Sequence, residues 1–237
     1  MDISRIWEDA DWTSEARQII DGLKKFPDNS KIILLLRHSQ RIEPIHFDKQ
    51  ADLNLTPLGR KMAKYFGNKL PKDRSIRLFH SIVERCRNTA EEIFSGFKEI
   101  GGKAILKGTL RPLSHIGINL DSFIEESKKY NNLEIFNRWS AGLYSSEFWS
   151  NLILYSQNAA KLIWPEITNT PEKGIDIHVS HDMHILALRF GWFGLPPNNK
   201  WINYLGGFAF SFNEDDILLY YDKKLKVVEI PYWWKKT

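Results

Sequence analysis

The chain is poor in cysteine, since Cys86 is the only one among its 237 residues. A disulfide within the chain is therefore excluded, and a metal cluster built on several thiolates is disfavoured. Long apolar runs are also absent, because no segment approaches the roughly 20 apolar residues that cross a membrane. The first nine residues lack the basic start and apolar stretch of a signal peptide, so we expect a cytoplasmic protein with no membrane partner.

Repeats, low-complexity tracts and a strong charge imbalance are absent as well. Lys and Arg number 33 against 29 Asp and Glu, which gives a net charge of +4. Such a mild excess suits a small anionic substrate and does not indicate a nucleic-acid partner. With 43% hydrophobic residues, the chain predicts one globular domain over residues 1–237.

The apolar pattern predicts an α/β fold. A continuous apolar run over 31–36 is typical of a central strand that is covered on both faces. Helical patterns alternate with the strands, which predicts a three-layer αβα sandwich around a mostly parallel sheet. Further strands are expected at 75–80, 104–106, 175–180, 207–212, 217–221 and 225–230. One helix is expected within 4–25, and residues 110–164 form an inserted helical cap in this interpretation.

Unusual polar residues follow three of the predicted strands. Arg37-His38 comes directly after the first strand, and His181-Asp182 directly after the strand at 175–180. Arg85 follows the strand at 75–80, and Arg41 lies four residues after Arg37. Because the carboxyl ends of strands in an open α/β sheet meet at one crevice, we expect these side chains to lie close together.

These residue types suit phosphoryl transfer. An arginine guanidinium is a planar fork that matches phosphate oxygens, so Arg37, Arg41 and Arg85 would bind a phosphate together with His181. Nearby arginines keep His38 neutral, and a neutral imidazole can attack phosphorus. Asp182 would then protonate the leaving alkoxide as a general acid and later act as a base.

In these segments the sequence resembles the histidine phosphatase superfamily. The similarity lies in Arg37-His38, in Leu55-Thr56-Pro57-Leu58-Gly59, in the spacing from Ser81 through Arg85 to Thr89-Ala90, and in Ser180-His181-Asp182. Four segments in the right order are more specific than Arg-His alone. The resemblance implies a phosphoglycerate mutase-like fold and a covalent phosphohistidine on His38.

The branch within this superfamily is suggested by the acidic residues. In the mutase-like branch a glutamate follows an arginine beyond the third strand, whereas here Arg111 is followed by Pro112. Asp182 follows His181 as in the acid phosphatase branch, where the mutase-like branch has glycine. The sequence therefore favours the acid phosphatase branch. Ser39 replaces the usual glycine after the nucleophile, and we expect Ser39 and Arg111 as possible substrate contacts.

The resulting hypothesis is a phosphomonoesterase that acts on a small-molecule phosphate ester without a cofactor or metal. His178, His181 and His184 have a spacing that resembles metal ligands, but the three need not share one face. Two alternatives stay open: a phosphoglycerate mutase-like phosphoryl transferase, and a non-catalytic phosphate-binding protein that retains the pocket. A monomer and a homodimer are equally compatible with the sequence.

Overall fold

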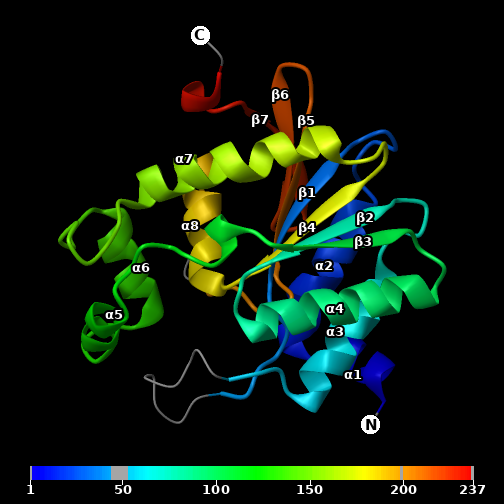
Figure 1. Cartoon of the computed structure of the whole chain (residues 1–237), viewed down its shortest axis with the longest axis horizontal. Helices are drawn as coiled ribbons and strands as arrows, with labels where there is room; N and C mark the ends of the chain where they lie inside the picture. Colours follow the sequence, from blue (N-terminus) through cyan, green and yellow to red (C-terminus); the bar gives the residue numbers. More distant parts are fainter. Residues whose placement is uncertain (1, 44–52, 198–199, 236–237) are drawn as a thin grey trace.

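The protein is described from a computed structural model that covers residues 2–43, 53–197 and 200–235. Its centre is a seven-stranded sheet with the order β3-β2-β4-β1-β5-β6-β7 (Figure 1). The strands are β1 (Ile32–Arg37), β2 (Ile76–His80), β3 (Ala104–Thr109), β4 (Ile175–Ser180), β5 (Gly207–Phe212), β6 (Asp216–Tyr221) and β7 (Lys224–Glu229). The main helices that follow β1, β2 and β4 are α3 (Pro57–Lys69), α4 (Glu84–Glu99) and α8 (Asp182–Phe193).

The sheet is mixed, with a parallel half and an antiparallel half. Strands β1 to β4 pair in parallel, whereas β5, β6 and β7 continue the sheet as antiparallel hairpins. Helical connections between the parallel strands bring successive strands back in the same direction. The predicted α/β sandwich is confirmed, and its parallel part is the part that carries the polar strand ends.

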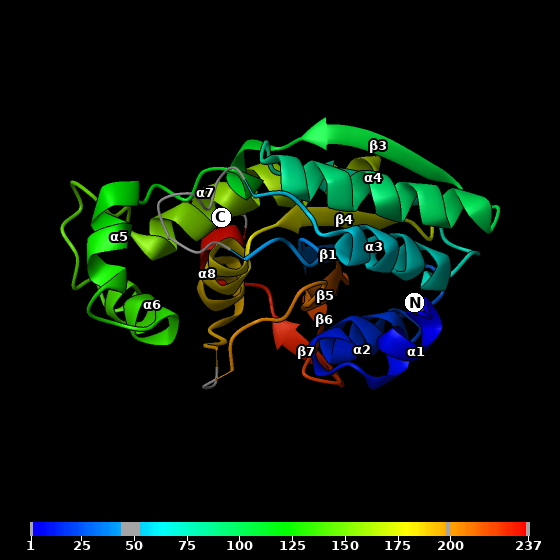
Figure 2. The same cartoon turned by 90° about the horizontal axis from the view of Figure 1, so that it is seen from below.

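Two hydrophobic cores lie on opposite faces of the sheet, and β1 contributes to both. Ile32, Leu34 and Leu36 belong to one core, and Ile33 and Leu35 belong to the other. Successive side chains of a strand point to opposite faces, so a strand covered on both sides must be apolar at every position. This explains the continuous apolar run of β1. The first core also contains side chains of α3 and α4, and the second contains side chains of α8. Figure 1 shows α3 and α4 below the sheet, and Figure 2 views the molecule from their side.

The single N-terminal helix predicted within 4–25 is wrong, because the chain breaks at Ala10. Helix α1 (Ile3–Asp9) is followed by a short 3-10 turn and by α2 (Ser14–Leu23), and Ala10 is extended with φ −77° and ψ 133°. The hydroxyl of Thr13 donates to the carbonyl groups of Trp7 and Ala10 at 2.9 and 2.6 Å. This buried side chain satisfies carbonyl groups that the helix end leaves open, which stabilises the break.

The segment predicted as a cap divides into two parts. Helices α5 (Leu120–Ser127) and α6 (Asn132–Ser140) stand beside the sheet, whereas α7 (Leu152–Ile163) crosses above it and packs on α8 (Figure 1). Only α5 and α6 therefore stand apart from the helical layer. A search of the described helices for a span long and apolar enough to cross a membrane finds none.

Candidate active site

The carboxyl ends of β1, β2 and β4 meet at one edge of the sheet. Arg37 at the end of β1 pairs with Ser180 at the end of β4, and His80 of β2 pairs with Val179. The residues that follow these strands surround a cleft of about 460 Å³. The predicted cluster of Arg37, His38, Arg41, Arg85, His181 and Asp182 lines this cleft, as do Glu43, Val83, Ser114, Leu120, Phe123, Asn132, Met183, His184 and Trp201.

His38 is buried and held in a defined orientation. Its Nδ1 lies 2.8 Å from the carbonyl oxygen of Ser39, an acceptor, so Nδ1 carries the proton and Nε2 keeps its lone pair. Arg85 Nε donates to this Nε2 at 3.1 Å. Burial lowers the pKa of His38 well below its usual value, and the charges of Arg37 and Arg85 lower the pKa further. His38 is therefore neutral near pH 7, as a nucleophilic imidazole must be.

Arg85 connects His38 to the second histidine of the cleft. Its Nη2 lies 3.1 Å from His181 Nδ1, while Ser81 Oγ lies 3.2 Å from His181 Nε2. The centres of the His38 and His181 rings are 5.5 Å apart. Burial is the main reason why the pKa of His181 is also well below its usual value, followed by the charges of His184 and His38. The arginine fork thus spans two neutral imidazoles that face one space.

Asp182 is ionised and forms an ion pair with Arg37. Its Oδ2 lies 2.9 Å from Arg37 Nη2 and accepts from Trp201 Nε1 at 3.0 Å, and its Oδ1 accepts from the Met183 backbone N–H at 2.8 Å. Burial raises the pKa of this carboxyl group, but Arg37, Trp201 and Met183 together lower it to about 2. Asp182 therefore lies at the cleft without a proton of its own at neutral pH.

Arg37 is positioned by a loop that comes from the far end of the chain. Its Nη1 donates to the carbonyl oxygen of Ile202 at 2.5 Å, and its guanidinium lies 4.3 Å from the centre of the Tyr204 ring. Arg41 lines the cleft beside it, with Nη2 3.8 Å from Glu43 Oε2. Both guanidinium groups therefore belong to the cleft that His38 also lines.

Ser39, which the sequence suggests as a possible substrate contact, has its side chain inside the fold and is not among the described residues that line the cleft. Its side chain is fully buried, its backbone N–H donates to Thr89 Oγ1 at 3.0 Å, and its Oγ donates to the Gly59 carbonyl oxygen at 2.7 Å. The hydroxyl thus joins the end of β1 to the first turn of α3. Serine is accommodated after His38 because its side chain points away from the cleft.

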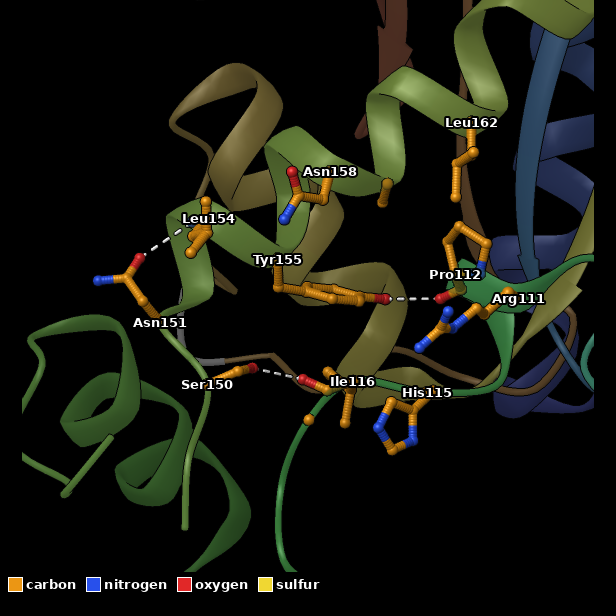
Figure 3. A pocket seen from close by; sticks show the side chains of 12 residues that line it. Arg111, Pro112, His115, Ile116, Ser150, Asn151, Leu154, Tyr155, Asn158 and Leu162 are labelled. Atoms are coloured by element: carbon orange, nitrogen blue, oxygen red, sulfur yellow. Dashed lines mark hydrogen bonds between the residues drawn. The ribbon is translucent and has the colours of Figure 1, made fainter. Parts of the chain in front are cut away.

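The expectation that Arg111 contacts the substrate is not supported, because Arg111 lies in a different pocket. Figure 3 shows this second pocket of about 390 Å³, formed between the segment 111–117 and helix α7. Tyr155 closes its inner side and donates its hydroxyl to the Pro112 carbonyl oxygen at 2.8 Å. A short 3-10 turn, Arg111–Leu113, directs the arginine to this exposed side.

Trp201 contacts Asp182 and Tyr204 contacts Arg37, and the sequence pattern indicates neither residue. Both precede β5, which pairs antiparallel with β1. An antiparallel neighbour begins at the edge where β1 ends, so the residues before β5 must lie beside Arg37. These two residues could be found only by knowing that β5 pairs with β1, and the local sequence does not reveal this pairing.

The three histidines with metal-like spacing do not converge. His178 is buried in β4 and stacks on Phe79 with ring centres 4.7 Å apart, while His181 and His184 lie at the cleft. Among the residues that the structure describes, no group of three His, Cys, Asp or Glu side chains is arranged to hold a metal ion. The chemistry that this cleft offers from its own side chains is that of imidazole, guanidinium and carboxylate groups.

Comparison with protein-family models gives a match over residues 33–209 to a model described as histidine phosphatase superfamily (branch 1). This range contains all six side chains of the predicted cluster. The match is to branch 1, so it supports the superfamily and not the sequence-based preference for the acid phosphatase branch. No curated protein sequence matches the chain significantly.

Several solved structures share the fold at low sequence identity. Phosphoserine phosphatase from Entamoeba histolytica, solved with 3-phosphoglyceric acid, is 18% identical with a TM-score of 0.57, over 81% of this chain and 95% of that one. A mycobacterial glucosyl-3-phosphoglycerate phosphatase, solved with VO3, is 17% identical with a TM-score of 0.57, over 85% and 100%. Phosphoglycerate mutase from Bacillus anthracis is 16% identical with a TM-score of 0.51, over 86% and 94%. These similarities establish the phosphoglycerate mutase-like fold.

Proposed function

Since this chain belongs to the histidine phosphatase superfamily (branch 1), we propose that it hydrolyses phosphate monoesters through a covalent phosphohistidine on His38. The observation that carries the proposal is the state of His38 Nε2. The Nδ1 contact with Ser39 leaves Nε2 unprotonated, and Arg85 holds that atom at the cleft. A buried neutral imidazole next to arginine forks is suited to attack a bound phosphate.

In the proposed binding step, Arg37, Arg41, Arg85 and His181 surround the phosphate oxygens. Arg85 exchanges its hydrogen bond to His38 Nε2 for one to phosphate, which releases the lone pair of the nucleophile. The guanidinium charges then offset the charge that spreads over the phosphate oxygens in the transition state. The cluster needs only side-chain rotations for this step, because the backbone of the strand ends is already in place.

In the chemical step, His38 Nε2 forms a bond to phosphorus while the bond from phosphorus to the ester oxygen breaks. The electron pair of that bond stays on the leaving oxygen, and Asp182 supplies the proton that turns it into an alcohol. The Nδ1–H of the phosphohistidine still donates to the Ser39 carbonyl oxygen, which stabilises the positive ring. Water then attacks phosphorus, Asp182 takes its proton, and phosphate and neutral His38 are released.

The proton donor requires a change at Arg37. The ion pair with Arg37 contributes to a pKa of about 2 for Asp182, so the carboxyl group has no proton to give while this ion pair is intact. When phosphate binds, Arg37 turns its fork towards the phosphate oxygens. The loss of that ion pair, together with the new negative charge, raises the pKa of Asp182 and lets it take up a proton. Proton donation from Asp182 follows the acid phosphatase style, here within a branch 1 chain.

Hydrolysis of a generic aryl phosphate by the purified protein tests this proposal. We expect release of inorganic phosphate, competitive inhibition by vanadate and unchanged rates after chelation. Loss of activity on chelation contradicts the mechanism. Transfer of the phosphoryl group between glycerates faster than its release as phosphate indicates the mutase alternative. Tight phosphate binding with no turnover over a broad phosphoester panel indicates a non-catalytic binding protein.

A further inference from the structure

The outer wall of the catalytic cleft carries several apolar side chains. Its apolar side chains are Leu120 and Phe123 of α5, Val83 and Met183 beside the strand ends, and Trp201, and the polar side chains of Glu43, Ser114 and Asn132 stand among them. Leu120 is 55% exposed to solvent. Single exposed apolar side chains are ordinary on protein surfaces, but a group of them around one cleft marks a binding surface.

Two more exposed apolar side chains flank the residues that line the cleft. Ile42 stands between Arg41 and Glu43 and is 50% exposed, and Ile82 precedes Val83 and is 71% exposed. The backbone N–H of Ile82 donates to Ser114 Oγ at 2.8 Å, so this position is tied to the cleft wall. Neither Ile42 nor Ile82 is among the described residues that line the cleft, so the apolar wall itself consists of the side chains from α5, Val83, Met183 and Trp201.

Phe123 is held in place by packing within the cap. Its ring lies 6.2 Å from that of Trp149, and Trp149 Nε1 donates to Ser122 Oγ at 2.7 Å. The contact comes from a buried tryptophan, so the phenylalanine is positioned before any ligand arrives. A preorganised aromatic side chain loses little conformational entropy when it packs against an apolar ligand group.

The charges of the cleft favour an uncharged leaving group. Arg37, Arg41 and Arg85 all line the cleft, and the proposed mechanism assigns all three to the phosphate oxygens. The rim instead carries the carboxylate of Glu43, which accepts a hydrogen bond from Tyr204 and whose side chain is 68% exposed. A carboxylate on the substrate's alcohol part would meet this like charge without a new cation from the described wall.

We infer that the alcohol part of the substrate is uncharged and apolar, and that Phe123 and Leu120 form the subsite that binds it. This inference rests on the proposed phosphatase function, because it concerns the leaving group of that reaction. It selects aromatic or bulky alkyl phosphate monoesters over phosphorylated hydroxy acids and amino acids.

The test compares three primary alkyl phosphates, so that the chemistry of the leaving oxygen is similar. We expect kcat/KM for 2-phenylethyl phosphate to exceed that for ethyl phosphate and for phosphoserine by about tenfold or more, because a buried phenyl ring gains hydrophobic free energy. Equal or faster hydrolysis of phosphoserine overturns the inference and leaves the phosphatase proposal intact.

A binding measurement keeps the two proposals separate. Calorimetry with 2-phenylethylphosphonate and ethylphosphonate measures the apolar subsite whether or not the protein turns over phosphate esters. Tighter binding of the phenylethyl compound by about tenfold supports the subsite, and equal binding overturns it. A complete lack of turnover in the same preparation counts against the phosphatase proposal alone.

Variants locate the subsite on the cap. Phe123→Ala is expected to reduce the preference for 2-phenylethyl phosphate over ethyl phosphate by about fivefold. Glu43→Gln is expected to raise kcat/KM for phosphoserine relative to kcat/KM for the two other phosphates. Phe148→Ala is the matched control, since Phe148 is 45% exposed and is not among the described residues that line the cleft. If the preference changes equally in Phe123→Ala and Phe148→Ala, the subsite has been assigned to the wrong residues.

Discussion

Two strands of the parallel half end in the same pair of residues and yet differ in chemistry. His38-Ser39 follows β1, and His80-Ser81 ends β2. In both pairs, histidine Nδ1 lies 2.8 Å from the carbonyl oxygen of the serine, and both rings are buried. The backbone at the strand end therefore orients the two rings alike.

The difference lies in what surrounds the other ring nitrogen. His38 Nε2 accepts from Arg85 and its ring faces His181. No arginine hydrogen bond reaches His80 within the described parts of the chain, and His80 is not among the described side chains that line the cleft. Local backbone geometry thus fixes the tautomer of both rings, whereas the arginine contact from another element distinguishes His38, the histidine that we propose as the nucleophile.

Removing each histidine in turn is expected to give the largest contrast. His38→Ala should lower kcat by about 10⁴-fold or more, because a covalent step loses its nucleophile. His80→Gln should stay within a few-fold of the parent. Steady-state hydrolysis of an aryl phosphate measures both, and thermal melting shows that both variants are folded. Similar losses in the two variants would remove the distinction between the two strand ends.

The contribution of Arg85, which contacts His38, can be compared with that of Arg87 on the same helix. Arg85→Lys keeps the charge but loses the fork between His38 and His181, and we expect kcat/KM to fall by about 10²–10³-fold. Arg87→Lys is the control, because Arg87 is exposed on the same helix and forms ion pairs with Glu84 and Glu91. The Arg87 variant should keep the parent kcat/KM. If Arg85→Lys also does so, Arg85 does not bind the phosphate.

Asp182→Asn tests the proton donor opposite the nucleophile. We expect kcat to fall by about 10²–10⁴-fold for an alkyl phosphate, whose leaving oxygen needs a proton. The loss should be clearly smaller for 4-nitrophenyl phosphate, since nitrophenolate leaves without protonation. The ratio of the two losses is the measurement. An equal loss with both substrates would mean that Asp182 positions Arg37 and does not donate the proton.

His178 is buried outside the cleft, and we expect it to make the stability of the fold depend on pH. Burial lowers the pKa of His178 to about 4 from 6.5, and both ring nitrogens lack a hydrogen-bond partner. Between these values the unfolded state binds more protons, so stability falls as the pH drops through this window. Between pH 7 and pH 5, the free energy of unfolding should fall by about 2 kcal/mol less in His178→Leu than in the parent protein. This estimate uses about 1.4 kcal/mol for each pH unit in the window.

Urea unfolding at the two pH values measures this effect. His115→Leu serves as the control, because the His115 side chain is exposed to solvent. An unchanged loss between pH 7 and pH 5 in His178→Leu would show that this histidine does not control acid sensitivity.

The sequence was sufficient where periodicity and strand ends carry the information. The strands of the parallel half were predicted to within a few residues, and their common edge brought Arg37, His38 and His181 together. What it could not show depends on contacts between distant segments. Trp201 reaches Asp182 only because β5 pairs with β1, and Ser39 points inward only because Gly59 offers its carbonyl group there.

Trapping the phosphorylated protein tests the central claim most directly. The protein is mixed with excess aryl phosphate, quenched in base within milliseconds to seconds, digested and mapped by mass spectrometry. The account predicts an acid-labile phosphoryl group on the peptide that contains His38, formed at least as fast as turnover and absent from His38→Ala. Rapid turnover without any phosphorylated peptide, or a phosphoryl group on another residue, would contradict it.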